Sequence, residues 1–161
     1  YTTALFAERI AAIRSKMPNA FIGIDVITGF PGEVDADFEE TFAFIESVAP
    51  SFLHVFPYSS RPGTPAADMP DHVHPSVSAE RVKKLTELSD KLHSDFCSRF
   101  TGQKARVLFE STNRKGYMGG FTGNYVKISA PYDKALINTI QTVIIGNVTE
   151  AGDYSATIIR E

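Results

Sequence analysis

Two kinds of hydrophobic spacing divide the chain. Up to Phe100, three segments carry apolar residues every three or four positions, which predicts helices, and two short apolar runs between them predict strands. The predicted helices cover residues 4–17, Asp35 to Pro50 and about 77–100, and the predicted strands cover 21–27 and 51–56. Because helices and strands alternate, this part is expected to be α/β with neighbouring parallel strands.

The three predicted helices differ in the strength of their apolar stripes. The first has a loosely spaced stripe, and Asp35 is expected to cap the second. The third has the most regular stripe, which consists of Val82, Leu85, Leu88, Leu92, Phe96 and Phe100. We therefore expect the third helix to bury its leucines against the two strands.

After Gly102 the spacing changes to two, which is typical of strands with one face buried. Strand-like segments occur at 104–110, 125–129, 142–150 and 154–160, and a glycine-rich segment lies at 113–124. About five strands in so short a stretch predict a small all-β barrel.

Composition narrows the class of protein. The 161 residues are 43% hydrophobic and 22% charged, as in an ordinary globular protein. No apolar run approaches the roughly 18 residues of a membrane span. The single cysteine, Cys97, excludes an internal disulfide and any site built from several cysteines of this chain, and it is expected to be partly buried and inert. The first residue is not Met and lies in a helical pattern, so we expect a piece of a longer protein.

The net charge of −3 conceals an asymmetry. Residues 1–95 carry 8 Lys and Arg against 14 Asp and Glu, a net of −6, whereas residues 96–161 carry 8 against 5, a net of +3. A difference of this kind suggests two domains, with an anionic partner for the basic one.

The strand at 21–27 contains the first candidate for chemistry, Asp25. Its apolar run resembles a buried strand of a parallel sheet, and it leads into the turn Gly-Phe-Pro-Gly-Glu. Asp25 either caps that turn or accepts hydrogen bonds from a ligand at the carboxyl edge of the sheet. Gly29 either forms the turn or lets a flat ligand approach the backbone.

The sequence HVFPYSSRPGTPA, at 54–66, covers the end of the second strand and the loop that follows it. It offers a cation and hydroxyl groups from Tyr58, Ser59, Arg61 and Thr64, although an ordered surface loop is the plainer interpretation. His54 is expected to be a core histidine. His72 and His74 have the spacing of metal ligands, but no third ligand accompanies them.

Basic and aromatic residues are interleaved in the predicted barrel. Such a mixture suits RNA, where phosphates meet Lys and Arg and unpaired bases stack on rings. A solvated barrel surface explains the same residues equally well at this stage. The candidates for RNA binding are Lys104, Arg106, Arg114, Lys115, Tyr117, Phe121 and Lys127, with Tyr125 beside them.

Together these stretches resemble the radical-SAM methylthiotransferases that modify tRNA. The resemblance covers nearly the whole chain and is carried by GIDVITGFPGE, DFEET, YSSRPGTPA and the helix ERVKKLTELSDKLH. It implies α/β units from the end of a radical-SAM barrel at 1–76, a linking helix at 77–100, and a five-stranded, OB-like TRAM barrel that binds RNA at 101–161. The loop looks closest to the branch that acts on threonylcarbamoyladenosine beside the anticodon.

The resemblance also implies cofactors. In the whole enzyme, iron–sulfur clusters and S-adenosylmethionine generate a radical that takes hydrogen from an adenine carbon, where a methylated sulfur is inserted. Asp25 would lie near the ribose or amino group of S-adenosylmethionine. The backbone around Val55 and Phe56, together with the Gly29 turn, would border its adenine. The family's CxxxCxxC is absent. We therefore expect no catalytic residue, metal ligand, bound cofactor or activity in this chain alone.

Two other functions stay open from the sequence. One is the related branch that methylthiolates a ribosomal protein, in which the barrel would hold protein. The other is an RNA-binding module without catalysis. In each case we expect a cytoplasmic protein that binds neither membrane nor DNA.

Overall fold

The computed structural model describes residues 2–110 and 116–159. The chain forms two compact units, Tyr1–Ser94 and Asp95–Glu161, and the boundary falls inside the longest helix. The fold class predicted from the sequence, α/β followed by all-β, is confirmed.

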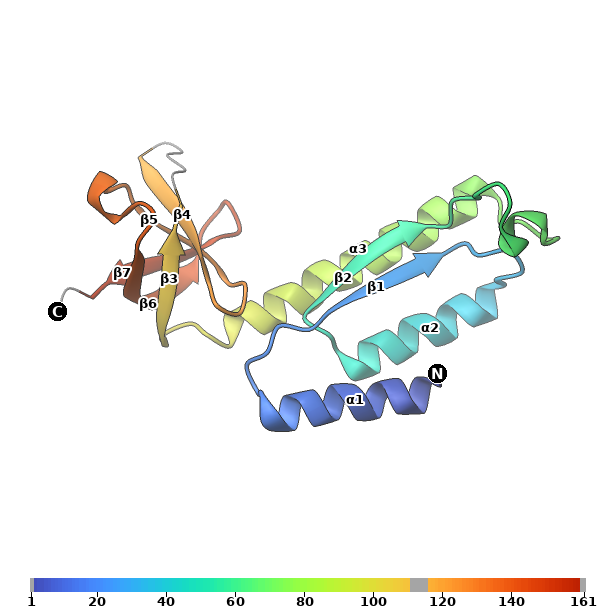
Figure 1. Ribbon diagram of the computed structural model, residues 1–161, viewed down its shortest axis with the longest axis horizontal. Helices are drawn as coiled ribbons and strands as arrows, with labels where there is room; N and C mark the ends of the chain where they lie inside the picture. Colours follow the sequence, from blue (N-terminus) through green and yellow to red (C-terminus); the bar gives the residue numbers. More distant parts are fainter. Residues whose placement is uncertain (1, 111–115, 160–161) are drawn as a thin grey trace. The chain divides into compact units, whose positions relative to one another are not determined.

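The first unit alternates helices and strands as predicted (Figure 1). Its elements are α1 (Thr3–Lys16), β1 (Gly23–Thr28), α2 (Asp35–Val48), β2 (Phe52–Pro57), the 3-10 turn η1 (Pro65–Asp68) and most of α3 (Pro75–Ser98). Strands β1 and β2 are parallel, with Asp25 opposite His54 and Ile27 opposite Phe56. The carboxyl ends of both strands therefore lie at the same edge of the sheet.

Helices α2 and α3 cover one face of this two-stranded sheet. The core consists of Phe38, Ile45, Leu53, Leu85, Leu88 and Leu92, with Ile24, Val26, Phe42 and Val55 packed around them. The predicted burial of the leucine stripe against the strands is thus confirmed. Burying apolar side chains of this size stabilises the unit by about 1.5–3 kcal/mol each.

Three expectations for the first unit are wrong. Strand β1 is buried on one face only, because helices cover only one side of the sheet, and His54 is exposed rather than part of a core. The cap of α2 is Val34 instead of Asp35, and the Asp37 carboxylate accepts a hydrogen bond from the Val34 N–H at 3.1 Å.

Helix α1 is attached to α2 by a polar contact and a ring contact. The Arg14 guanidinium donates to the Val48 carbonyl at 2.7 Å and also to the Ala49 carbonyl, both at the C-terminal end of α2. A cation there satisfies carbonyls that have no partner within the helix. The rings of Phe6 and Phe44 meet edge to face at 6.0 Å. Arg14 therefore stabilises α1 despite its weak apolar stripe.

The second unit contains a closed barrel of five strands in the order β3-β4-β5-β7-β6, as predicted. The strands are β3 (Lys104–Phe109), β4 (Tyr117–Thr122), β5 (Lys127–Pro131), β6 (Ile140–Val148) and β7 (Tyr154–Ile158), with the turn η2 (Lys134–Leu136) before β6. Strand β4 lies inside the glycine-rich segment. Strand β5 begins two residues later than predicted because Tyr125 belongs to a tight turn.

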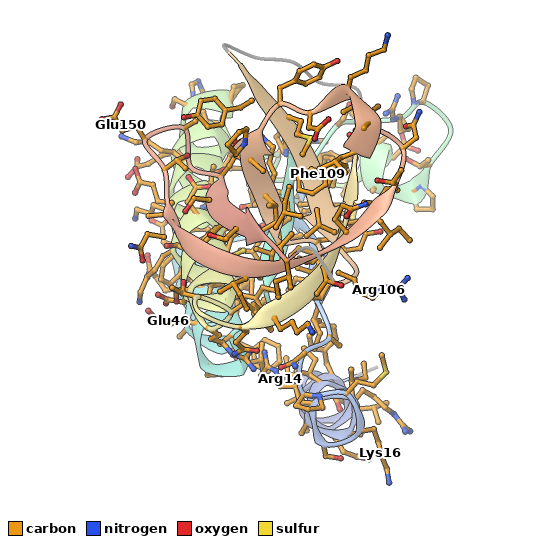
Figure 2. All side chains as sticks on the ribbon, turned by 90° about the vertical axis from the view of Figure 1, so that its left-hand side faces the viewer. Arg14, Lys16, Glu46, Arg106, Phe109 and Glu150 are labelled. Atoms are coloured by element: carbon orange, nitrogen blue, oxygen red, sulfur yellow. The ribbon has the colours of Figure 1, made fainter. Side chains whose placement is uncertain are left out.

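Alternation separates the barrel's interior from its exterior. Figure 2 shows Phe109 inside the barrel and Arg106 extending outward from the same strand. The interior is filled by Val107, Phe109, Met118, Val126, Ile128, Val143 and Ile145. Outward positions on β3 are therefore available for a partner.

Candidate functional site

The uncovered face of the β1–β2 sheet carries a mixed set of side chains. Asp25 and His54 lie opposite each other, and Ile27 and Phe56 follow toward the carboxyl edge. Ile27 is 59% exposed and Phe56 is 51% exposed. An exposed carboxylate beside an exposed ring and a branched aliphatic side chain can bind a ligand that has both polar groups and a flat apolar part.

Val55 and Gly29, which are also predicted to border a cofactor, contribute no side chain to this face. The Val55 side chain packs toward the core, so only its backbone is available to a ligand at this face. Gly29 is buried and has φ of +77°, and a Cβ added there would lie 2.6 Å from the Ser78 hydroxyl oxygen. The open side of Gly29 is therefore filled by α3.

The turn after β1 is organised by the Glu33 carboxylate. It accepts hydrogen bonds from the Thr28 hydroxyl at 3.1 Å, the Gly29 N–H at 2.8 Å and the Phe30 N–H at 3.3 Å. One carboxylate thus satisfies three donors at the end of the strand. These hydrogen bonds hold the turn at the carboxyl edge of the sheet, beyond the exposed Asp25 and Phe56.

Arg81 of α3 holds this turn, and the sequence analysis missed it. Its guanidinium donates to Glu33 Oε1 at 2.8 Å and to Asp35 Oδ1 at 2.7 Å, while the side chain is 6% exposed. It also donates to the Glu33 carbonyl at 3.2 Å. The sequence could have predicted this role. Arg81 lies four residues before Leu85 and therefore on the buried stripe, where a charged side chain requires a partner.

The loop after β2 folds back beside the same turn. The Tyr58 N–H donates to the Thr28 carbonyl at 2.8 Å, and the Tyr58 ring meets the Phe30 ring at 5.2 Å. The Thr64 hydroxyl donates to the Arg61 carbonyl at 2.8 Å and closes a turn. Of the four predicted loop residues, Ser59 and Arg61 are exposed, whereas Tyr58 and Thr64 are half-buried.

A pocket on the outer surface of the barrel brings together part of the predicted RNA-binding set. It combines two charged side chains with apolar and aromatic ones from several strands and a turn. It is lined by Arg106, Leu108, Glu110, Phe121, Thr122, Gly123, Tyr125 and Ile140. The exposed apolar and aromatic side chains of this pocket make it a candidate binding surface.

The pocket walls are exposed apolar side chains. Leu108 is 46% exposed, Phe121 39%, Tyr125 64% and Ile140 53%. Leu108 lies opposite both Phe121 and Ile140 in the strand pairing, so the three form one outward row. The outward position of Leu108 could be predicted, because Leu108 alternates in the sequence with interior residues. Ile140 was missed because β6 begins earlier than predicted.

The remaining predicted RNA-binding residues lie elsewhere on the barrel or outside the described residues. Lys104 is exposed on β3, and Tyr117 is 53% exposed on β4. Lys127 is opposite Phe121 and pairs with Asp153 at 2.8 Å. Arg114 and Lys115 lie outside the described residues.

Cys97 is enclosed in the second unit and is 2% exposed. Burial raises the pKa of its thiol to about 11, so the thiol stays protonated at neutral pH. Because the thiolate is the metal ligand and the nucleophile, Cys97 is poorly suited to either role.

Two features are absent from the residues that the structure describes. Within residues 2–110 and 116–159, no three His, Cys, Asp or Glu side chains gather in a geometry that could hold a metal ion. In the same ranges, no helix combines the length and hydrophobicity needed to cross a membrane.

Comparison with known proteins places the chain in a group of homologues. It is 38% identical over 149 residues to the threonylcarbamoyladenosine tRNA methylthiotransferase MtaB of Bacillus subtilis, covering 90% of the chain and 33% of the relative. It is 33% identical over 163 residues to the tRNA-2-methylthio-N(6)-dimethylallyladenosine synthase of Acetivibrio thermocellus, covering 99% of the chain and 34% of the relative. The synthase of the same name from Bacillus cereus is 35% identical over 157 residues, covering 96% of the chain and 30% of the relative.

No protein-family model matches the chain. The chain spans about a third of the length of the curated relatives it matches. It is homologous to the radical-SAM tRNA methylthiotransferases along nearly all of its own length, and the resemblance predicted from its motifs is confirmed.

Proposed function

We propose that this chain is part of a radical-SAM enzyme that methylthiolates N6-threonylcarbamoyladenosine next to the tRNA anticodon. The homology over 90–99% of the chain is the observation that carries the proposal. The loop HVFPYSSRPGTPA and the 38% identity to a relative named for threonylcarbamoyladenosine favour this nucleoside over dimethylallyladenosine.

The two units of the chain have separate roles in this proposal. The exposed β1–β2 face borders S-adenosylmethionine, and the outer surface of the barrel binds tRNA. A net charge of +3 over residues 96–161, with exposed Lys104 and Arg106, supports a polyanionic partner for the barrel.

The residues of the β1–β2 face fit S-adenosylmethionine. Asp25 is an exposed carboxylate that can pair with the ligand's amino group or accept hydrogen bonds from ribose hydroxyls. Phe56, two residues further along the neighbouring strand, offers an exposed ring to the adenine. S-adenosylmethionine supplies the radical and the methyl group when bound, and these residues orient it.

The residues of this chain do not fit an iron–sulfur cluster. A cluster of this type needs three or four thiolates, and the sequence contains one cysteine, which is buried with its thiol protonated. The clusters of the proposed enzyme therefore require cysteines beyond these 161 residues. Alone, the chain is expected to bind RNA without catalysing the reaction.

Replacement of Asp25 in the full-length enzyme tests the cofactor face. A charge-assisted hydrogen bond contributes about 1.5–3 kcal/mol, so Asp25→Asn is expected to raise the Kd for S-adenosylmethionine about tenfold to a hundredfold. The cluster-loaded enzyme is titrated with S-adenosylmethionine, and Glu40→Gln, an exposed carboxylate of α2, is the matched control. An unchanged Kd together with lower thermal stability would leave Asp25 only a structural role.

A further inference from the structure

We propose that the barrel pocket binds one unpaired guanine base of the RNA. The proposal rests on the proposed function, because it assumes that RNA is the partner of the barrel. It adds what the pocket recognises: a base taken out of its stack, with its polar edges read by Arg106 and Glu110. Phe121 and Tyr125 supply the aromatic surface.

The residues that line the pocket suit a planar base better than a phosphate. Phe121, Leu108 and Ile140 form the apolar row across three strands, and Tyr125 stands at its end in the turn after β4. An ideal Cβ built on Gly123 meets no atom within 4 Å, so the space beside the turn is open. Every base has a π-face that can stack on such rings.

Tyr125 is held in an unusual backbone conformation that presents its ring. Its φ is +64°, a left-handed backbone conformation that is rare for bulky side chains and common for glycine. The turn is fixed by hydrogen bonds from the Tyr125 N–H to the Thr122 carbonyl at 3.1 Å and from the Val126 N–H to the Thr122 hydroxyl at 2.9 Å. Such conformations cluster at binding sites, and here the result is a ring that is 64% exposed.

Glu110 distinguishes this pocket from a site for phosphates alone. Its backbone N–H pairs with the Gly119 carbonyl at 2.8 Å, so it continues the pairing of β3 with β4. A carboxylate repels phosphate, and its presence among basic and aromatic residues indicates recognition of hydrogen-bond donors instead. Among residues 2–110 and 116–159, no ion pair joins Glu110 or Arg106 to another side chain.

Guanine is the base whose edges match this pair of charges. Its N1–H and N2–H groups are two adjacent donors for the Glu110 carboxylate, and its O6 and N7 are two adjacent acceptors for the Arg106 guanidinium. Uracil presents one donor between two carbonyl oxygens. Adenine and cytosine each present an amino group beside a ring nitrogen that accepts.

The test measures binding of the 161-residue chain to uridine oligomers that carry one central guanosine, adenosine, cytidine or uridine. The wild-type chain is expected to bind the guanosine oligomer about tenfold more tightly than the others. Glu110→Ala is expected to abolish that preference. If the pocket binds only phosphates, Glu110→Ala should instead increase the affinity for all four oligomers, because the substitution removes a negative charge.

The aromatic wall is tested separately. Tyr125→Leu keeps an unbranched Cβ and an apolar side chain but removes the ring, and it is expected to weaken binding of the guanosine oligomer about tenfold. Tyr132→Leu is the matched control, because Tyr132 is 39% exposed on the same barrel but does not line the pocket. Thermal unfolding of both variants checks that the barrel remains folded.

Three results would overturn the proposal: no guanosine preference in the wild-type chain, a uniform gain in affinity for Glu110→Ala, or equal effects of the two tyrosine variants. If the wild-type chain binds oligomers but shows one of these results, the base pocket is wrong and tRNA binding stands. If it binds neither the oligomers nor tRNA but retains a ribosomal protein, both the pocket and the tRNA-binding role are wrong.

Discussion

Gly29 lies where α3 passes closest to the turn after β1. Its φ is +77°, and the Ser78 hydroxyl occupies the position that a Cβ would need. Gly32, three residues on, has φ of +86° but meets no atom within 4 Å of an ideal Cβ. The two glycines share the backbone requirement and differ in packing.

This pair allows the packing effect to be measured alone. Both Gly29→Ala and Gly32→Ala are expected to lose about 1 kcal/mol from the left-handed backbone. Gly29→Ala is expected to lose a further 1–3 kcal/mol, roughly, because Ser78 and α3 must shift. Equal free energies of unfolding for the two variants, measured in urea, would show that Ser78 of α3 does not exclude a Cβ at Gly29.

Among the elements, α3 is the longest helix, and within the first unit it makes two kinds of contact. Its leucine stripe packs on β1, β2 and α2, and Arg81 reaches the turn that ends β1. The same helix therefore stabilises the sheet and positions its carboxyl edge. Each contact predicts a different mutational effect.

The leucine stripe is tested at Leu88, which is 4% exposed. Leu88→Ala removes buried methyl groups and leaves a cavity, so unfolding is expected to require about 2–5 kcal/mol less. Val77→Ala, at a 37% exposed position of the same helix, is the control and is expected to change stability by less than roughly 0.5 kcal/mol. A comparable effect at both positions would contradict the packing described for α3.

The polar contact is tested by Arg81→Met. This substitution leaves the Glu33 carboxylate, which is 15% exposed, without its cation, so a loss of about 3 kcal/mol is expected. Lys83→Met is the control, because Lys83 is 77% exposed and its pair with Glu87 spans 3.9 Å. If both variants unfold at the same urea concentration as the wild-type chain, Arg81 does not anchor the turn.

Most elements were predictable because their spacing is local information. The leucine stripe, both parallel strands and the five-strand barrel follow from periodicity and turn residues. Asp25 was chosen because it is a carboxylate in an apolar strand, and Phe56 was chosen by resemblance. The structure adds that the two share an exposed face. Whether a strand is covered on one face or two depends on tertiary neighbours, so the exposure of His54 was not foreseen.

The barrel pocket required information that the sequence does not contain locally. Residues on three strands and a turn, separated by up to thirty-four positions from Arg106 to Ile140, meet only after the strands pair. Arg106 and Phe121 were predicted because interleaved basic and aromatic residues are typical of RNA-binding surfaces. Glu110 was not predicted, because a carboxylate does not belong to that pattern.

For the molecule as a whole, charge and homology suggest that one unit binds the cofactor and the other binds RNA. Residues 1–95 carry a net charge of −6 and include the proposed cofactor face, whereas residues 96–161 carry +3 and include the proposed RNA face. The relatives are named for tRNA methylthiolation, and the chain spans about a third of their length. We propose on these grounds that the protein containing this chain modifies tRNA.

Mass spectrometry of tRNA nucleosides tests that claim most directly. The sample is tRNA from cells that lack the full-length gene encoding this chain, compared with the same cells carrying the gene on a plasmid. We expect 2-methylthio-N6-threonylcarbamoyladenosine to disappear, its precursor N6-threonylcarbamoyladenosine to accumulate, and the plasmid to reverse both changes. An unchanged nucleoside profile would contradict the account, and loss of the methylthiolated dimethylallyl nucleoside instead would contradict the assigned substrate.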